Sequence, residues 1–308
     1  MKFNREDLKL KSLSGRTSKI TSDLLAGEWQ ADTPVSEFVC SLPDILAVRE
    51  MRKLARALVE ARETGGARLL MYGGHVIKCG LGPLIVRWLE DGVFTALATN
   101  GAGSIHDLEM ALYGATSEDV QAGIKDGSFG MWEETAKHYG KALDRRQGIG
   151  YGIGLEIIEN GGNTRISPMA AAVEKGCTVT VHPSLGSDIV HPAHHVDWQS
   201  LGREAEKDFV LFAEVVGSLA NGVVLNAGSA VVMPEVFLKA LSSVRNLGFP
   251  VENITTADFD MIKQYRSTFN VVRRPVDALG GQTVEITGHH ELMMPLLDVF
   301  IRAEEGEK

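Results

Sequence analysis

Residues 93–120 contain the clearest pattern of residue types that could bind a ligand. An apolar run over 93–99 leads into Asn100-Gly101-Ala102-Gly103-Ser104 and then into an amphipathic helix. Small residues let the backbone approach a ligand closely, and the free N–H groups at the start of a helix favour an anion. The pattern is typical of a phosphate-binding loop, although a plain strand-to-helix turn also needs glycine.

Four other polar segments that contain small residues are expected at the ends of strands. They are Gly73-Gly74-His75, residues 182–188 (HPSLGSD), Asn226-Ala227-Gly228-Ser229 and residues 256–260 (TADFD). Because ligands bind at the carboxyl ends of parallel strands, the set predicts one long groove for a dinucleotide or another extended polar ligand. Turn formation explains each loop alone, whereas for the whole set we favour a ligand.

Histidines between residues 182 and 195 offer a second kind of chemistry. His182, His191, His194 and His195 lie within fourteen residues, with Asp188 among them. Pro192 restricts His191 to extended geometry, and the sequence has no His-Glu-x-x-His signature. We therefore favour hydrogen-bonded loop residues or a substrate-facing acid/base over a metal site.

His289-His290-Glu291, near the end of the chain, poses the same choice. The candidate catalytic acid/base residues are thus His191, His289, His290 and Glu291, although Glu291 could simply favour the dipole of the helix that follows. For covalent catalysis the sequence lacks a Gly-x-Ser-x-Gly elbow, and Ser229 is typical of a helix start. Lys78 is the best-placed lysine, and a solvated or phosphate-facing role is favoured there over a nucleophilic one.

Composition narrows the possible partners. The 308 residues have 31 Lys and Arg against 40 Asp and Glu, a net charge of -9, which gives no reason to expect nucleic acid or an anionic membrane as a partner. Three cysteines are too few and too scattered for a disulfide framework. The N-terminus lacks the apolar core of a signal peptide, and no run is long enough for a membrane span, so we expect a cytoplasmic protein.

Strands that alternate with helices must position these residues. The pattern predicts a doubly wound, mainly parallel α/β sheet with helices on both faces, preceded by an N-terminal arm over residues 1–42. Residues 43–308 then form a single nucleotide-binding domain, because no linker divides them. Strands are predicted at 68–72, 93–99, 177–181, 222–227, 254–258, 269–272 and 282–287, and helices at 43–62, 83–90, 116 onward, 131–144, 147–160, 167–175, 203–220, 234–247 and 292–304.

Several of these segments resemble the deoxyhypusine synthases. TNGAGSIHDL lines up without a gap with that family's TTAGG-x-EEDL, and TTADFD is similar to its Thr-Ala-Gln-Glu-Phe-Asp. SPMAAAVEKGCTVTVHPSLGSD resembles the helix, strand and loop with its Ser-Leu-Gly-Asp-like turn. NGVVLNAGSAVVMPEVFLKA stands where the family has a triple-glycine loop, and HHELMMPLLDVF resembles its terminal helix start. The order of these matches is kept over residues 67–300.

The resemblance implies a Rossmann-type fold that binds NAD, and a homotetramer whose active sites lie between subunits. Together with the loop over 100–104, it implies a set of cofactor-binding residues. They are Thr99, Asn100, Gly101, Gly103, Ser104, Asp107, Ser187, Asp188, Gly228, Ser229, Asp258 and Asp260.

One departure bears directly on the activity. Deoxyhypusine synthases pass a butylamine through an imine on the lysine of a Trp-Gly-Lys segment, but residues 265–275 here read YRSTFNVVRRP. The family's paired histidines after the triple glycine are replaced by Pro234-Glu235. Because arginine stays protonated at neutral pH and cannot form the imine, butylamine transfer is not expected.

Arg266, Arg273 and Arg274 instead place positive charge where a polyamine enzyme needs acids, which suggests an anionic substrate; ion pairs with neighbouring acids are the alternative. The sequence therefore favours an NAD-dependent transferase or oxidoreductase that acts on a small molecule and is not a true deoxyhypusine synthase. A non-catalytic NAD-binding regulator and a sugar-phosphate or phosphate-transfer enzyme remain as alternatives.

Overall fold

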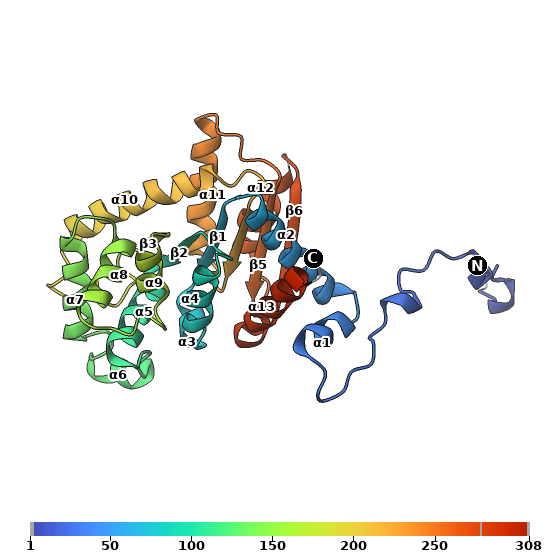
Figure 1. Cartoon of the computed structure of the whole chain (residues 1–308), viewed down its shortest axis with the longest axis horizontal. Helices are drawn as coiled ribbons and strands as arrows, with labels where there is room; N and C mark the ends of the chain where they lie inside the picture. The colour runs from blue at the N-terminus through green and yellow to red at the C-terminus, as the bar shows by residue number, and fades with distance from the viewer. Residues whose placement is uncertain (1–2, 278, 307–308) are drawn as a thin grey trace.

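A parallel sheet of six strands forms the centre of the computed structural model, which describes residues 3–277 and 279–306 (Figure 1). Every neighbouring pair is parallel, in the order β3-β2-β1-β4-β5-β6. The central strands are buried along their whole length, which explains why they read as continuous apolar runs. The predicted doubly wound α/β fold is confirmed. The strands are β1 (Arg68–Tyr72), β2 (Ala96–Asn100), β3 (Thr178–His182), β4 (Val223–Ala227), β5 (Ile254–Asp260) and β6 (Gly281–Thr287).

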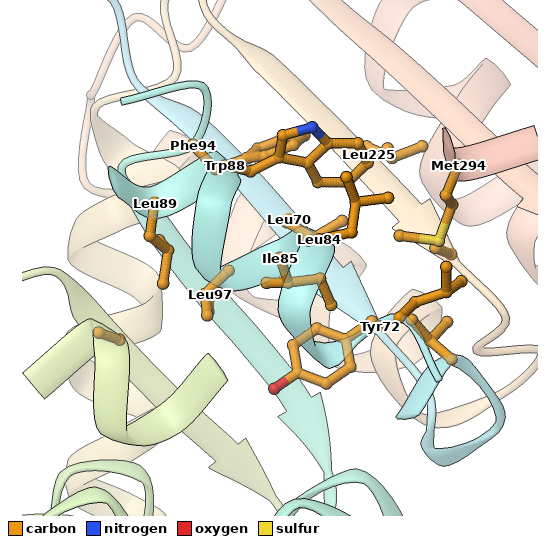
Figure 2. Packing of buried hydrophobic residues seen from close by; sticks show 14 of the residues in the cluster. Leu70, Tyr72, Leu84, Ile85, Trp88, Leu89, Phe94, Leu97, Leu225 and Met294 are labelled. Carbon is orange, nitrogen blue, oxygen red and sulfur yellow. The ribbon is translucent and has the colours of Figure 1, made fainter. Parts of the chain in front are cut away.

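Helices cover both faces of this sheet. In β1, Leu70 and Tyr72 enter one apolar core while Leu69 and Met71 enter another, because successive side chains of a strand point to opposite faces. Figure 2 shows the first core, where side chains of α4 pack on the central strands. The helices are α1 (Val35–Ser41), α2 (Leu46–Glu63), α3 (Gly74–Lys78), α4 (Gly82–Glu90), α5 (Gly101–Tyr113), α6 (Val120–Asp126), α7 (Glu133–Asp144), α8 (Ile149–Glu159), α9 (Pro168–Lys175), α10 (Trp198–Gly217), α11 (Val232–Asn246), α12 (Arg274–Asp277) and α13 (His290–Gly306). Within the described ranges, no helix is long and apolar enough to cross a membrane.

The N-terminal segment leaves the body of the molecule (Figure 1). It contains short 3-10 turns at Arg5–Asp7, Leu13–Gly15 and Ser22–Leu24. Helix α1 then packs against α13, and its Val39 is fully buried in the first core. Packing onto the domain thus begins before residue 43, and the division between arm and domain at that residue stays a prediction.

Some local predictions were wrong, including the helix predicted over 203–220, which is α10 and begins at Trp198. Residues 269–272 are not a strand but part of a π-helix, η4 (Ser267–Arg273), whose Val271 and Val272 are buried in the second core. Buried β-branched residues favour a strand in sequence, yet here tertiary packing decides the backbone. The helix predicted from residue 116 begins instead after Asp119, whose carboxylate accepts the N–H of Ala122 at 3.1 Å.

Asp298 of α13 hydrogen-bonds to α4 at the first core. Its Oδ1 accepts the indole N–H of Trp88 at 2.8 Å, and its Oδ2 accepts Nη2 of Arg87 at 2.7 Å and Nε of Arg302 at 3.0 Å. Trp88 is fully buried, so its N–H has no access to water as a substitute partner. The carboxylate therefore satisfies a donor that nothing else can reach.

We predict that Asp298→Ala lowers the free energy of unfolding by about 2 kcal/mol, because it leaves the Trp88 N–H buried without an acceptor. Urea denaturation followed by circular dichroism measures this change. Asp91→Ala is the matched control, since it removes only an exposed ion pair with Arg302 and should cost less than about 1 kcal/mol. Equal losses in the two variants would contradict the assignment.

Candidate functional site

The strand order reverses between β1 and β4, and the loops that follow these two strands touch there. Gly73 donates its N–H to the carbonyl of Ala227 at 2.9 Å. A Cβ on Gly73 would lie 2.2 Å from the carbonyl oxygen of Gly228, and Gly228 itself has φ of +63°. The two loops thus meet through backbone at the place where doubly wound folds bind their ligands.

The loop after β2 has the geometry of a helix start. Asn100 caps α5 by accepting the N–H of Gly103 at 2.9 Å, and the Ser104 hydroxyl donates to the carbonyl of Gly101 at 2.8 Å. The Thr99 hydroxyl, fully buried, donates to the carbonyl of Tyr72 at 2.8 Å. These predicted cofactor residues lie together, and their side chains hydrogen-bond to the backbone of the loop and of β1.

Asp188 lies over the first turn of α5, where the sequence predicts a phosphate. A Cβ on Gly101 would lie 2.0 Å from the Asp188 carboxylate, which accepts the N–H of Ser184 at 3.1 Å. Burial raises the pKa of Asp188 to about 6. A carboxylate is favoured at the start of a helix, so this side chain supplies the negative charge that the helix attracts.

His191 is paired with this carboxylate. Its Nδ1 accepts the N–H of Gly186 at 3.1 Å, which leaves the proton on Nε2, 3.5 Å from Oδ2 of Asp188. Burial lowers the pKa of His191. Ser187 is exposed and its hydroxyl donates to the carbonyl of Ser184 at 2.8 Å. Asp188 and His191 therefore form one unit, with Ser187 on its outer side.

Polar side chains also gather after β4 and β5. Asn226 donates to Oδ1 of Asp258 at 2.7 Å, and Ser229 accepts the N–H of Met233 at 3.2 Å, as expected of a helix start. Burial raises the pKa of Asp258 to about 6 against the opposing hydrogen bond of Asn226. Asp260 accepts the adjacent N–H of Met261 at 2.7 Å.

His290 is the one predicted acid/base residue whose ring has no partner. It is 1% exposed, and neither ring nitrogen hydrogen-bonds to any residue in the described ranges. Its Nε2 lies 2.7 Å from where Gly228 would carry a Cβ, so the ring reaches the edge between β1 and β4. His75 stacks edge-on at 5.8 Å between ring centroids. By contrast, His289 and Glu291 are exposed and lie 3.9 Å from each other.

The arginines of η4 have partners within the chain. Arg266 pairs with Glu235 at 3.1 Å, and Arg273 with Glu285 at 3.5 Å. Arg274 donates to Asn270 and to the hydroxyl of Tyr265. Figure 1 places α12, which begins at Arg274, at the opposite end of the sheet from α3 and α6. Arg266 is held to the first turn of α11, which follows β4, and the partner of Arg273, Glu285, stands beside Asp258 in the register of β5 and β6.

The histidines between residues 182 and 195 do not converge. His182 stacks on Phe212 at 4.8 Å in the interior, and burial lowers its pKa to about 3. His194 and His195 stack on each other at 4.1 Å. Within residues 3–277 and 279–306, no three His, Cys, Asp or Glu side chains are grouped so that they could hold a metal ion.

Asp107 lies beneath the site. It is 1% exposed, and its Oδ2 accepts the N–H of Met169 at 2.9 Å in the first turn of α9. Burial raises its pKa to about 7. Its contacts are thus those of a helix cap.

Sequence reasoning missed a cavity of about 660 Å³ between α5, α6 and α7. His106, Glu109 and Tyr113 line it from one face of α5, at the spacing of successive helical turns that the sequence already shows. The remaining lining residues are Lys78, Ala115, Thr116, Ser117, Glu118, Val120, Phe129, Trp132, Glu134, Thr135 and Ile189.

The chain matches no family model, and no curated protein matches it in sequence. Its fold is similar to that of AgrE in ternary complex with ornithine and NAD+, with a TM-score of 0.53, 15% identity, and coverage of 86% of this chain and 35% of AgrE. A candidate deoxyhypusine synthase from Entamoeba histolytica gives 0.52 at 10% identity and covers 89% and 95%. A conserved candidate LOR/SDH protein from Methanococcus maripaludis S2 gives 0.50 at 17% and covers 90% and 72%.

This chain therefore spans about a third of the length of AgrE, 35%. At these identities the similarities show the fold and not membership of a family. The chain has a deoxyhypusine synthase-like α/β fold, which is also similar to that of AgrE.

Proposed function

We propose that the protein is an NAD-dependent enzyme that acts on a small molecule and is not a deoxyhypusine synthase. The observation that supports this most strongly is His290, a buried imidazole without a partner at the point where the strand order reverses. The similarity of the fold to AgrE, whose complex contains NAD+, supports the choice of cofactor.

The residues present fit such a cofactor. The loops after β1 and β4 meet through the backbone of Gly73 and Gly228, at the place where doubly wound folds bind dinucleotides, and Asp188 can accept a hydrogen bond from a ribose hydroxyl. NAD supplies a hydride acceptor when bound. His290, whose pKa is lowered by burial, is the neutral base that can take the proton a substrate hydroxyl or amine loses.

The lysine that would carry the butylamine in a deoxyhypusine synthase is missing from the corresponding stretch of this chain. The stretch 265–275 contains no lysine, and most of it forms η4, where Arg273 is held by Glu285. An imine requires an amine that can lose its proton, which a guanidinium does not supply. This is why we propose an activity different from that of the synthases.

An anionic group of the substrate could meet one of the three arginines Arg266, Arg273 and Arg274. All three arginines have partners within the chain, and the partner of Arg266, Glu235, stands in the first turn of α11, directly after the loop that follows β4. We propose Arg266 as the residue that would meet an anionic group of the substrate, with Arg273 and Arg274 as secondary candidates. A cytoplasmic location and a homotetramer are part of the same proposal, and mass photometry tests the assembly.

NAD should stabilise the folded chain. At about 100 times its dissociation constant, we predict that NAD or NADH raises the free energy of unfolding by ~2.7 kcal/mol. Thermal-shift and urea measurements with NAD, NADH, ATP and glucose 6-phosphate check this. A larger shift with ATP or the sugar phosphate would favour a phosphate-transfer enzyme, and no shift with either nicotinamide nucleotide would reject the proposal.

Affinity for NAD should depend on the ionisation of Asp188. Because the pKa of this carboxyl is raised to about 6, the carboxylate that accepts a ribose hydroxyl is lost below that pH and complete above it. We predict that affinity rises between pH 5 and pH 7, by about tenfold, and that Asp188→Asn removes this rise. Calorimetric titration measures both. Asp144→Asn, on the exposed end of α7, is the control and should keep the wild-type profile.

His290 should control turnover and not nucleotide binding. We predict that His290→Gln lowers kcat by about 100-fold while the dissociation constant of NAD stays within about twofold. Absorbance at the NADH band, with panels of small alcohols, hydroxy acids and amines, gives the rate. His289→Gln is the matched control because His289 is exposed.

Because burial lowers the pKa of His290, the base form is present at neutral pH, and kcat/KM should fall only as acid protonates the ring. Wild-type turnover in His290→Gln would exclude this role. Saturable NAD binding without turnover of any panel compound would identify the regulator instead.

A further inference from the structure

None of the predicted cofactor residues lines the cavity between α5, α6 and α7. It adjoins the β1 loop through His106, whose Cδ2 lies 2.9 Å from where Gly74 would carry a Cβ. The volume of about 660 Å³ is that of a small-molecule site. Ser117, in its wall, has φ of +73°, a backbone conformation that a serine rarely adopts.

A chain of hydrogen bonds fixes the tautomer of His106. The hydroxyl of Thr116 donates its only proton to Oε2 of Glu109 at 2.6 Å, so it must accept from Nδ1 of His106 at 2.7 Å. Thr135 donates to the other oxygen of Glu109 at 2.9 Å. Nδ1 therefore carries the proton, and Nε2 is left as an acceptor that hydrogen-bonds to none of the described residues.

Charge in the wall disfavours an anion, because the three glutamates Glu109, Glu118 and Glu134 outnumber Lys78. Glu109 already accepts hydrogen bonds from Thr116 and Thr135, and Glu118 accepts the N–H of Gly130, so hydrogen bonds within the chain already use these two carboxylates. Lys78 opposes a cation beside His106, since after burial it is the second cause of the lowered pKa of that ring, about 4. Beside three hydroxyl residues, the rest of the lining is apolar or aromatic, including Tyr113, Phe129, Trp132 and Ile189.

We propose that this cavity binds a neutral, largely apolar small molecule with a hydroxyl group, and that Nε2 of His106 accepts the hydrogen bond of that hydroxyl. The lining gives the apolar body a surface to cover, and the fixed tautomer makes His106 an acceptor at neutral pH. The site goes beyond the proposed function and needs no nucleotide.

Calorimetric titration of the full chain without NAD tests the site, with four probes that share a phenyl ring. They are 2-phenylethanol, ethylbenzene, 3-phenylpropionate and 2-phenylethylamine. We expect 2-phenylethanol to bind saturably and about tenfold tighter than the two ionic probes. Quenching of tryptophan fluorescence, lost in Trp132→Phe, places the ligand in this cavity.

The variant His106→Leu has a side chain of similar size without the acceptor nitrogen. It should weaken the binding of 2-phenylethanol about tenfold and leave the binding of ethylbenzene unchanged. Thr116→Val should weaken 2-phenylethanol less, because the imidazole remains but its tautomer is no longer fixed. The control His194→Leu, exposed and outside the lining, should change neither.

Equal affinity of 2-phenylethanol for His106→Leu and the wild type would overturn the assignment. So would tighter binding of the amine or the carboxylate, or no saturable binding of 2-phenylethanol. Since no measurement involves NAD, these results are independent of whether the proposed enzyme activity is correct.

Discussion

The contact between the backbones of Gly73 and Gly228 constrains the rest of the edge. A Cβ on Gly73 would lie 2.2 Å from the carbonyl oxygen of Gly228, so a larger residue at position 73 would force the two loops apart. The N–H of Gly73 bonds to the carbonyl of Ala227 at 2.9 Å, so the pairing of β1 with β4 continues to the ends of both strands. Because neither glycine has a side chain, the ring of His290 can reach the edge from α13.

Buried carboxylates hold the elements around that edge. Asp208 joins α8 to β3 by accepting the N–H groups of Gly150 at 2.9 Å and Val181 at 2.7 Å, and Asp107 holds the start of α9. Burial raises the pKa of both carboxyls to about 7. Buried backbone N–H groups need an acceptor. A buried acid can therefore be required by the free N–H groups of a helix start, and it does not by itself indicate a ligand.

The sequence predicted the sheet well because parallel strands buried on both faces leave a strong pattern. Each of the short apolar runs that ends in a polar, small-residue loop became a strand of this sheet. The same logic failed at residues 269–272, where Val271 and Val272 are equally apolar but pack from a π-helix. Periodicity over so short a run cannot distinguish a strand from a helix, because either structure would bury the same side chains.

Site residues were harder to predict because chemistry depends on which atoms remain without partners. Asp107 and Asp188 have the same side chain and both lie near the loop after β2, yet one caps α9 and the other pairs with His191. His106 lies in the segment that resembles the synthases, but its importance follows from Thr116, ten residues away, which fixes its tautomer. Such a relation is set by the packing of α5 and cannot be seen in spacing alone.

Helix α5 serves different purposes on different sides. Its first turn meets Asp188, its buried side gives Asp107 to α9, and its outer side presents His106 and Glu109 to the cavity. With about 3.6 residues per turn, adjacent residues point in directions about 100° apart, so His106 and Asp107 must face different environments. A groove and a separate cavity can therefore share one helix, since a ligand on one side need not disturb side chains on the other.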